Sequence, residues 1–245
     1  MLLEDMGNAI RTWRQRLGFT QNDLASALQV SPQAVSKWER GENAPDIALL
    51  PALSEVLGAS VDTLLCSNWR ERRTVEATAV FVDMQGFGPL SRDSPPADVA
   101  IALNAFFYAV TEHLLARDGI PIKYIGDEIL CVFTGEGHRL RAFRAVFAAR
   151  AAAPKPARYT LASGPVWMGS IGHPLYARPD VLGETVNVAS VLQEWLKGNA
   201  PSLVAAAASA VDPVRDALEL GASGELSTWC TKEPVKAYEV TGLRL

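Results

Sequence analysis

The sequence predicts an α+β protein, with a small all-α domain followed by a ferredoxin-like α/β sandwich. Three observations support this fold class. Apolar residues recur every three or four positions over residues 1–66, a spacing typical of short packed helices. Residues 67–74 form a charged stretch without periodicity, and strand-like and helix-like patterns alternate after it. We therefore expect an all-α domain at 1–66, a linker at 67–74 and an α/β domain at 75–245.

The signals for helix ends divide the first domain into short helices. A first helix is expected to end at Gly18, and further helices are expected to begin after the N-caps Thr20, Ser31 and Ser60. Another helix is expected over residues 47–57. Between the second and third helices, a tight turn at 29–31 completes a helix-turn-helix arrangement.

The α/β domain shows the order strand, helix, strand, strand, helix, strand, which is the ferredoxin-like order. It then continues with one more helix and three short strands. The expected strands lie at 75–82, on either side of Gly126-Asp127, at 158–168, and near 202, 227 and 236, and the expected helices lie at 97–117, 136–152 and 184–197.

The composition indicates a globular chain. Of 245 residues, 49% are hydrophobic and 20% are charged, with a net charge of -4, which argues against disorder and against a broad phosphate-binding surface. The three cysteines lack metal or disulfide spacing. No apolar run is long enough for a membrane span and no signal-peptide pattern is present, so we expect a cytoplasmic protein without a membrane partner. The histidines also lack metal spacing and are expected at the surface or in turns: His113, His138 and His173.

The helix-turn-helix segment resembles the Cro/repressor-type family over about residues 8–65. The resemblance rests on residues that fall where the family pattern requires them: Thr20-Gln21, Leu24-Ala25, Val30-Ser31, Val35-Ser36, Trp38-Glu39 and Gly41.

This resemblance implies that the second helix of the motif enters the major groove of operator DNA. Gln33, Ser36 and Lys37 would then face base edges, and Gln21 and Arg40 would face phosphates. Residues 1–66 hold five basic and eight acidic residues, so a monomer is expected to bind DNA weakly. A dimerising or partner-binding role is the alternative.

Four segments of the α/β domain carry the chemical signal. They are FVDMQGF at 81–87, KYIGDEIL at 123–130, ASGPVWMGSIG at 162–172 and DVLGETVNVAS at 180–190. In this order, across residues 75–245, they resemble the catalytic domain of class III adenylate and guanylate cyclases. The resemblance implies a homodimeric enzyme that converts a nucleoside triphosphate to a 3',5'-cyclic monophosphate, a second messenger, and pyrophosphate.

Two carboxylates are the expected metal ligands. Asp83 ends the first strand and Asp127 lies in a hairpin turn beside it, and Mg²⁺ or Mn²⁺ takes oxygen ligands from such carboxylates and from a triphosphate. By resemblance the Met84 carbonyl group helps to hold two ions per active site. The same resemblance implies that phosphate is bound by the backbone amides of Gln85, Gly86 and Phe87.

The resemblance also assigns the nucleoside contacts. Lys123 and Asp180 would read the base, and Asn187 would orient the ribose. A lysine donor and a carboxylate acceptor match adenine, which favours ATP. Tyr124 adds bulk beside Lys123, and a smaller base pocket is the basis of an alternative, a UTP or CTP cyclase that makes a second messenger in antiphage defence.

Some positions depart from the family pattern. Val191 stands four residues after Asn187, where the family has a transition-state arginine, and loss of one such donor typically costs roughly 10²- to 10³-fold in rate. A second alternative is therefore a catalytically silent, nucleotide-binding cyclase fold that regulates the helix-turn-helix. Retention of Asp83, Asp127 and Asn187 together favours an enzyme.

Overall fold

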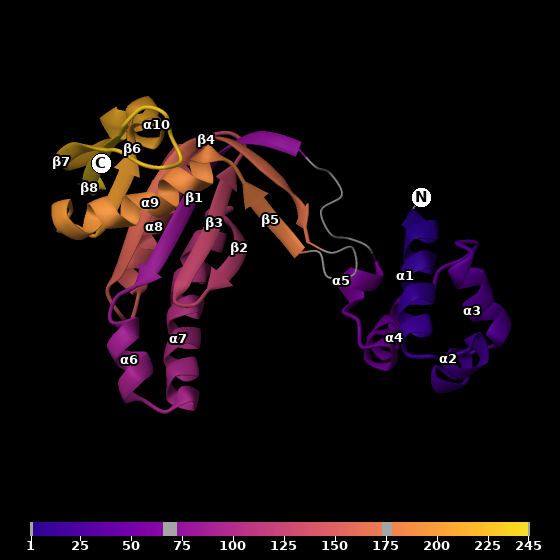
Figure 1. The fold of residues 1–245 in the computed structure, drawn as a ribbon. Coiled ribbons are helices and arrows are strands. Elements are labelled where there is room, and N and C mark those ends of the chain that lie inside the picture. Colours follow the sequence, from indigo (N-terminus) through magenta and orange to yellow (C-terminus); the bar gives the residue numbers. More distant parts are fainter. Residues whose placement is uncertain (1, 66–72, 173–177, 245) are drawn as a thin grey trace. The chain divides into compact units, whose positions relative to one another are not determined.

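A computed structural model describes residues 2–65, 73–172 and 178–244 (Figure 1). The chain divides into two compact units, one of residues 1–71 with 170–179 and one of residues 72–169 with 180–245. Most of the expected linker, residues 67–72, and His173 lie outside the described residues. Each unit is described by itself.

The first unit is helical. Its buried core includes Ile10, Leu24, Val35 and Leu53, one from each of four helices. The elements are α1 (Leu2–Arg16), α2 (Gln21–Ala27), α3 (Pro32–Glu39), the 3-10 turn η1 (Ile47–Leu49), α4 (Leu50–Leu57) and α5 (Val61–Leu64).

The expected caps are present in this unit. Thr20 forms a capping box with Asp23, and the Ser31 and Ser60 hydroxyl groups accept hydrogen bonds from backbone amides of the helices that they precede. Between α2 and α3, Gln29 has a φ of 55°, which reverses the chain in the expected turn. The helix-turn-helix arrangement is thereby confirmed.

The second unit is a mixed sheet with helices on both faces. The strand order is β2-β3-β1-β4-β6-β8-β7, and β5 pairs with β4. The strands are β1 (Arg73–Met84), β2 (Ile120–Ile125), β3 (Glu128–Thr134), β4 (Ala157–Ile171), β5 (Arg178–Leu182), β6 (Val204–Ala207), β7 (Leu218–Leu226) and β8 (Val235–Leu243). The helices are α6 (Phe87–Asp93), α7 (Pro96–Leu115), α8 (His138–Ala152), α9 (Glu184–Asn199), α10 (Ala208–Val211) and the 3-10 turn η2 (Asp212–Ala217).

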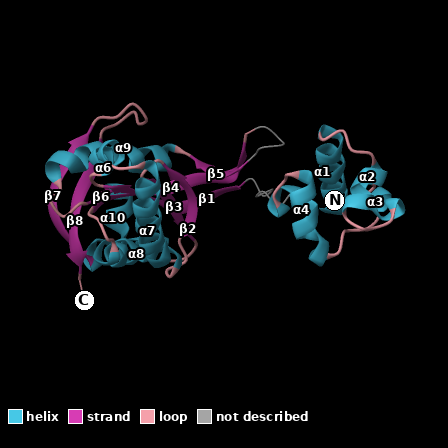
Figure 2. Cartoon of the chain, turned by 90° about the horizontal axis from the view of Figure 1, so that it is seen from below, coloured by secondary structure: helices cyan, strands magenta, loops and turns pink. Residues whose placement is uncertain are grey.

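Two layers of helices enclose the sheet. The helices α7 and α8 lie on one face and α9 lies on the other (Figure 2). The main core forms where Phe106 of α7 and Phe143 of α8 pack with Val80, Val82 and other apolar residues of the strands. The predicted α+β class, a helical domain followed by an α/β sandwich, is confirmed.

Several elements differ from the sequence prediction. The strand expected near 227 ends at Leu226, and the strand expected near 202 runs from Val204 to Ala207. Both α6 and β5 were missed, because α6 is a single short helix after a left-handed glycine, Gly86, and β5 forms only by pairing with β4. Within the described parts of the chain, the helices are too short or too polar to cross a membrane.

Candidate functional site

The two expected metal ligands lie together at one end of the sheet. Asp83, in β1, is 8% exposed and is the register partner of Glu128 in β3. Asp127 precedes Glu128 in the β2–β3 turn, which Gly126 makes possible with a φ of 61°. The Asp127 carbonyl oxygen accepts a hydrogen bond of 3.3 Å from the Met84 amide. Strand pairing therefore places the two carboxyl groups side by side.

Negative charge is concentrated at this end of the sheet. Burial, and then the neighbouring Asp83 carboxylate, raise the pKa of Asp127, whereas a backbone hydrogen bond and, to a smaller extent, Arg158 act to lower it. Burial also raises the pKa of Glu128, against a hydrogen bond from Gln193 and with the charges of Asp83 and Asp127 adding to the rise. Such a cluster favours protons or cations close to it.

Arg158 is a site residue that the sequence analysis missed. It lies on β4 as the register partner of Asp83, and its Nη1 atom donates a hydrogen bond of 2.7 Å to Asp83 Oδ2. The pairing of β1 with β4 brings the two residues together from 75 positions apart. No local pattern around residue 158 signals this contact.

The carboxyl groups fit a divalent cation that shares its ligands with a substrate. Asp83 and Asp127 supply anionic oxygens in a position with excess negative charge. Across the described ranges there is no group of three or more metal-ligating side chains. Magnesium is commonly held by one or two carboxylates together with phosphate oxygens and water, so two carboxylates are sufficient for this kind of site.

The expected phosphate-binding segment follows β1. The Gln85 amide donates a hydrogen bond of 2.9 Å to the Pro156 carbonyl oxygen, so it is engaged within the chain. Gly86 has a φ of 82° and precedes α6, whose first residue is Phe87. The amides of Gly86 and Phe87 therefore belong to the start of a helix, where backbone N–H groups have no partner within the helix.

The expected base-reading residues form an ion pair. Lys123 Nζ, on β2, donates a hydrogen bond of 2.7 Å to Asp180 Oδ2, on β5. Tyr124, next to Lys123, points to the other face of the sheet, where its ring stacks on Phe107 of α7 at 4.4 Å between centroids. Its hydroxyl group lies 3.1 Å from that of Thr111. The bulk of Tyr124 is therefore directed at α7 and not at Lys123.

Helix α9 carries the expected ribose residue. Asn187 and Val191 lie one turn apart on this helix, and both are half-buried. Two residues further, the Gln193 amide donates a hydrogen bond of 3.3 Å to Glu128 Oε1. Among the described residues, no hydrogen bond or ion pair connects Lys123 or Asp180 to Asp83.

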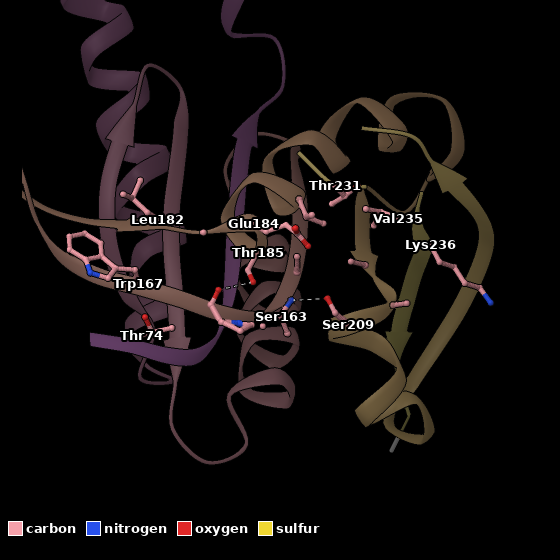
Figure 3. A pocket seen from close by; sticks show the side chains of 17 residues that line it. Thr74, Ser163, Trp167, Leu182, Glu184, Thr185, Ser209, Thr231, Val235 and Lys236 are labelled. Carbon is pink, nitrogen blue, oxygen red and sulfur yellow. Dashed lines mark hydrogen bonds between the residues drawn. The ribbon is translucent and has the colours of Figure 1, made fainter. Parts of the chain in front are cut away.

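A cavity of about 620 Å³ lies elsewhere in the same unit. It opens beside Thr74 at the start of β1, whereas Asp83 lies near the end of that strand. Ser163, Thr185 and Ser209 line it, and the Ser163 amide donates a hydrogen bond of 3.1 Å to Ser209 Oγ (Figure 3). The residues that line this cavity are not among the predicted site residues.

Behind this cavity, a buried chain of polar groups corrects one expectation. Ser163 Oγ lies 2.8 Å from Thr78 Oγ1, which lies 2.8 Å from His138 Nδ1. His138 was expected at the surface or in a turn, but it is 6% exposed at the start of α8. Burial, and then the charge of Arg139, lower its pKa. Thr78, which contacts the His138 ring, lies on β1, and Ser163, which contacts Thr78, lies on β4.

The predicted DNA-reading residues lie on α3. Gln33 and Lys37 are exposed, and Ser36 is half-buried. Arg40, at the end of α3, is exposed and its Nε atom donates a hydrogen bond of 2.6 Å to Glu42. Gln21 Nε2 donates to Glu39 Oε2 at 2.9 Å, so this side chain also contacts the interior of its own unit.

Glu39 is a buried acid in the helix-turn-helix. It is 3% exposed, and Arg14 binds both of its carboxylate oxygens, at 2.5 and 3.0 Å. Burial alone would raise the pKa of Glu39, but the hydrogen bonds from Arg14 and Gln21 hold it below its usual value. This network ties α1, α2 and α3 together.

Comparison with known proteins separates the two parts of the chain. Residues 10–64 match the helix-turn-helix family model. The HTH-type transcriptional regulator DicA of Escherichia coli is 45% identical over 60 residues, which cover 24% of this chain and 44% of that protein. Adenylate cyclase 1 of Rhizobium meliloti is 26% identical over 192 residues, which cover 71% of this chain and 28% of that protein. The chain thus spans less than half the length of either relative.

Solved structures are similar to the larger part. The adenylyl cyclase CyaB from P. aeruginosa aligns with a TM-score of 0.61 and 21% identity, over 71% of this chain and 97% of that one. The guanylate cyclase domain of RhGC from Catenaria anguillulae aligns with a TM-score of 0.60 and 20% identity, over 70% of this chain and all (100%) of that one. The α/β sandwich therefore has the fold of adenylyl and guanylyl cyclase domains.

Proposed function

We propose that residues 75–245 are a nucleotide cyclase domain that converts ATP to 3',5'-cyclic AMP and pyrophosphate. The observation that carries the proposal is the adjacent pair Asp83 and Asp127, in a sheet with the fold of adenylyl and guanylyl cyclase domains. In the reaction the ribose 3'-oxygen bonds to the α-phosphorus, and the bond from that phosphorus to the bridging oxygen breaks. Pyrophosphate leaves, and the hydroxyl proton passes to solvent.

In this proposal Asp83, Asp127 and the Met84 carbonyl group hold two Mg²⁺ or Mn²⁺ ions. Bound cations of this kind favour ionisation of the attacking hydroxyl group and neutralise charge on the pyrophosphate. The backbone amides at the start of α6, those of Gly86 and Phe87, bind the phosphates together with the segment around Gln85. Asn187 orients the ribose so that its 3'-oxygen faces the α-phosphorus.

The base is proposed to be adenine. Lys123 would donate to a ring nitrogen and Asp180 would accept from the exocyclic amine, which is the pattern of adenine and not of guanine. The existing ion pair between the two side chains supports this, because it holds a donor and an acceptor next to each other. Both are partly exposed, at 40% and 21%, so a base can reach them.

The proposed enzyme is a homodimer with two equivalent sites. Asp83 and Asp127 of one subunit would face Lys123, Asp180 and Asn187 of the other. The Lys123–Asp180 pair joins β2 to β5 and the Arg158–Asp83 pair joins β4 to β1, so both groups are already held in place within one subunit before a partner binds. Mixing Asp83→Asn with Asn187→Ala should then recover about a quarter of normal activity once subunits exchange freely.

The main experiment is incubation of the purified chain with ATP, GTP, CTP and UTP and Mn²⁺, with products identified by mass spectrometry. Cyclic AMP should dominate, and Asp83→Asn or Asp127→Asn should abolish it. The matched control is Asp118→Asn, because that side chain is 86% exposed and lies outside the proposed site. Undiminished turnover in both site variants would refute the metal assignment.

The same experiment decides between the alternative activities. Cyclic UMP or CMP as the main product would make the chain a pyrimidine cyclase, consistent with a role in antiphage defence. Nucleotide binding without any product would make it a silent cyclase fold that regulates the helix-turn-helix. Val191 motivates this last outcome, because an apolar side chain cannot stabilise developing phosphate charge.

We also propose that the first unit binds operator DNA through α3. The match to the helix-turn-helix family model and the exposure of Gln33 and Lys37 support this. Random-site selection on the full chain should enrich a sequence with two half-sites about one helical turn, or a multiple, apart. Gln33→Ala should relax the selected sequence, whereas Arg40→Ala, at a proposed phosphate contact, should mainly weaken binding. No enriched sequence at low salt would favour a protein-interaction role.

A further inference from the structure

The ion pair between Arg158 and Asp83 differs from an isolated ion pair because further carboxyl groups lie beside it. Arg158 meets one carboxylate oxygen of Asp83 at 2.7 Å, in a position where Asp127 and Glu128 add further negative charge. One guanidinium thus faces more than one carboxyl group. Arg158 acts on Asp83 and Asp127, and Lys197 acts on Glu128, so the carboxyl groups outnumber the cations beside them.

Space is available beside the guanidinium. Arg158 and Gln85 line a hollow of about 350 Å³ with residues 196–201, which are the last turn of α9 and the two residues after it. The side chain of Arg158 is 25% exposed, whereas that of Asp83 is 12% exposed. The side chain of Arg158 therefore borders open space and is not enclosed by core residues.

We infer that Arg158 is the resident counter-ion of the carboxylate pair, which it neutralises in the absence of a divalent cation and for which it competes with that cation. This inference rests on the proposed function, in which Asp83 and Asp127 hold the metal. A positive charge this close to a bound cation opposes its binding. The same charge stabilises the empty site, because it offsets repulsion between the buried Asp83 and its half-buried neighbours Asp127 and Glu128.

The counter-ion role predicts two effects of opposite sign. Arg158→Met should lower the Tm of the metal-free protein, because the buried Asp83 loses its partner. It should also raise the affinity for Mn²⁺, on the order of tenfold, because a competing charge is gone. A residue that only packs or orients Asp83 would, on replacement, lower the Tm and the affinity together.

Two variants make the test specific. Arg158→Lys keeps the charge and should keep the Mn²⁺ affinity near that of the unmodified chain. Arg141→Met is the matched control: its side chain is also 25% exposed and paired with an acid, Asp118. It contacts Thr134, which lies six residues from Glu128 along β3, or about 20 Å. This control should lower the Tm without changing Mn²⁺ affinity more than twofold.

The experiment uses the full chain, with Mn²⁺ binding followed by electron paramagnetic resonance and metal-free stability followed by thermal unfolding. A lower Tm with tighter Mn²⁺ binding in Arg158→Met supports the inference. A parallel fall of both, or no change in either, overturns it. If the unmodified chain binds no Mn²⁺, the metal part of the proposed function fails. In that case the Tm of metal-free Arg158→Met still tests whether Arg158 neutralises the carboxyl groups. An unchanged Tm would overturn that part of the inference too.

Discussion

Two buried carboxylates, one in each unit, are paired with arginine but differ in their charge balance. Glu39 of the helical unit accepts hydrogen bonds from Nε and Nη2 of Arg14 and from the side-chain amide of Gln21. Asp83 of the sandwich receives a single hydrogen bond from Arg158, while other carboxyl groups lie beside it. Glu39 has more than one hydrogen-bond donor, whereas Asp83 shares Arg158 with Asp127.

The pKa values report the same difference. Burial acts to raise the pKa at both sites, but hydrogen bonds from Arg14 and Gln21 hold the pKa of Glu39 low. At the sandwich site the pKa of Asp127 is raised, first by burial and then by Asp83. A fully compensated acid stabilises a fold, whereas excess buried negative charge destabilises it until a cation binds. The comparison thus separates a structural ion pair from a candidate binding site.

The largest expected effect is at the compensated acid. Arg14→Met leaves Glu39 buried without its main partner, which should cost about 3–5 kcal/mol of the unfolding free energy of the helical unit. Hydrogen exchange of residues 2–65 in the full chain measures it. The control is Arg40→Met, an exposed pair with Glu42, which should leave exchange nearly unchanged. Equal effects of the two changes would contradict the distinction between the two kinds of pair.

The next largest effect is a contrast in stability: removing the charge of Glu39 should destabilise its unit, whereas removing the charge of Asp127 should stabilise the sandwich. Glu39→Gln should destabilise the helical unit, because Arg14 is left without a charged partner. Asp127→Asn should raise the Tm of the metal-free sandwich by about 2 °C, because it relieves repulsion with Asp83. Calorimetry of the metal-free chain follows the sandwich, and hydrogen exchange follows the helical unit. A loss of stability in Asp127→Asn would remove the argument for excess negative charge.

A third case is a buried polar group that has no hydrogen-bond partner to offset the cost of its burial. The Tyr159 hydroxyl group is buried with no hydrogen-bond partner among the described residues, and burial raises its pKa. Tyr159→Phe should therefore stabilise the sandwich, by about 1 kcal/mol at most. Chemical denaturation of the two proteins measures this difference. Destabilisation would reveal that the hydroxyl group has a partner, such as a bound water molecule.

The smallest effect concerns pH and His138. Its pKa is lowered in the folded state by burial and then by Arg139, so the unfolded chain binds this proton more readily. The contribution of neutral His138 to the unfolding free energy is therefore fully present above about pH 6.5. It is lost as the pH drops from there through the lower pKa of the folded state. His138→Gln should reduce the loss of unfolding free energy between pH 7.5 and about pH 5.5. An identical loss in both proteins would show that other groups dominate.

The fold was largely predictable because its signals are local. The caps Thr20 and Ser31 and the alternation of strand and helix patterns specify elements from a few neighbouring residues. The element β5 was missed because a five-residue strand acquires its identity only from its partner β4. Pairing between distant strands is a tertiary property, and local patterns do not encode it.

The candidate site shows the same limit. Asp83 and Asp127 could be proposed because each stands in a recognisable motif, and strand pairing does bring them together. Arg158 could not be proposed, because its role depends on register with Asp83 across β1 and β4. His138 was expected at the surface or in a turn, because a single histidine reveals nothing about Thr78, which lies 60 positions away and binds it.

The pairing of β1 with β4 bears on how the site can be controlled. The two strands pair without interruption from Arg73 to Met84, so the cavity end and the carboxylate end belong to one continuous ladder. A slip of one residue would turn every side chain of β1 to the opposite face, so small sliding movements are not available. If residues before β1 regulate the proposed activity, we therefore expect them to change the fraction of molecules in which this sheet is correctly formed. The turnover rate of each such molecule should stay the same.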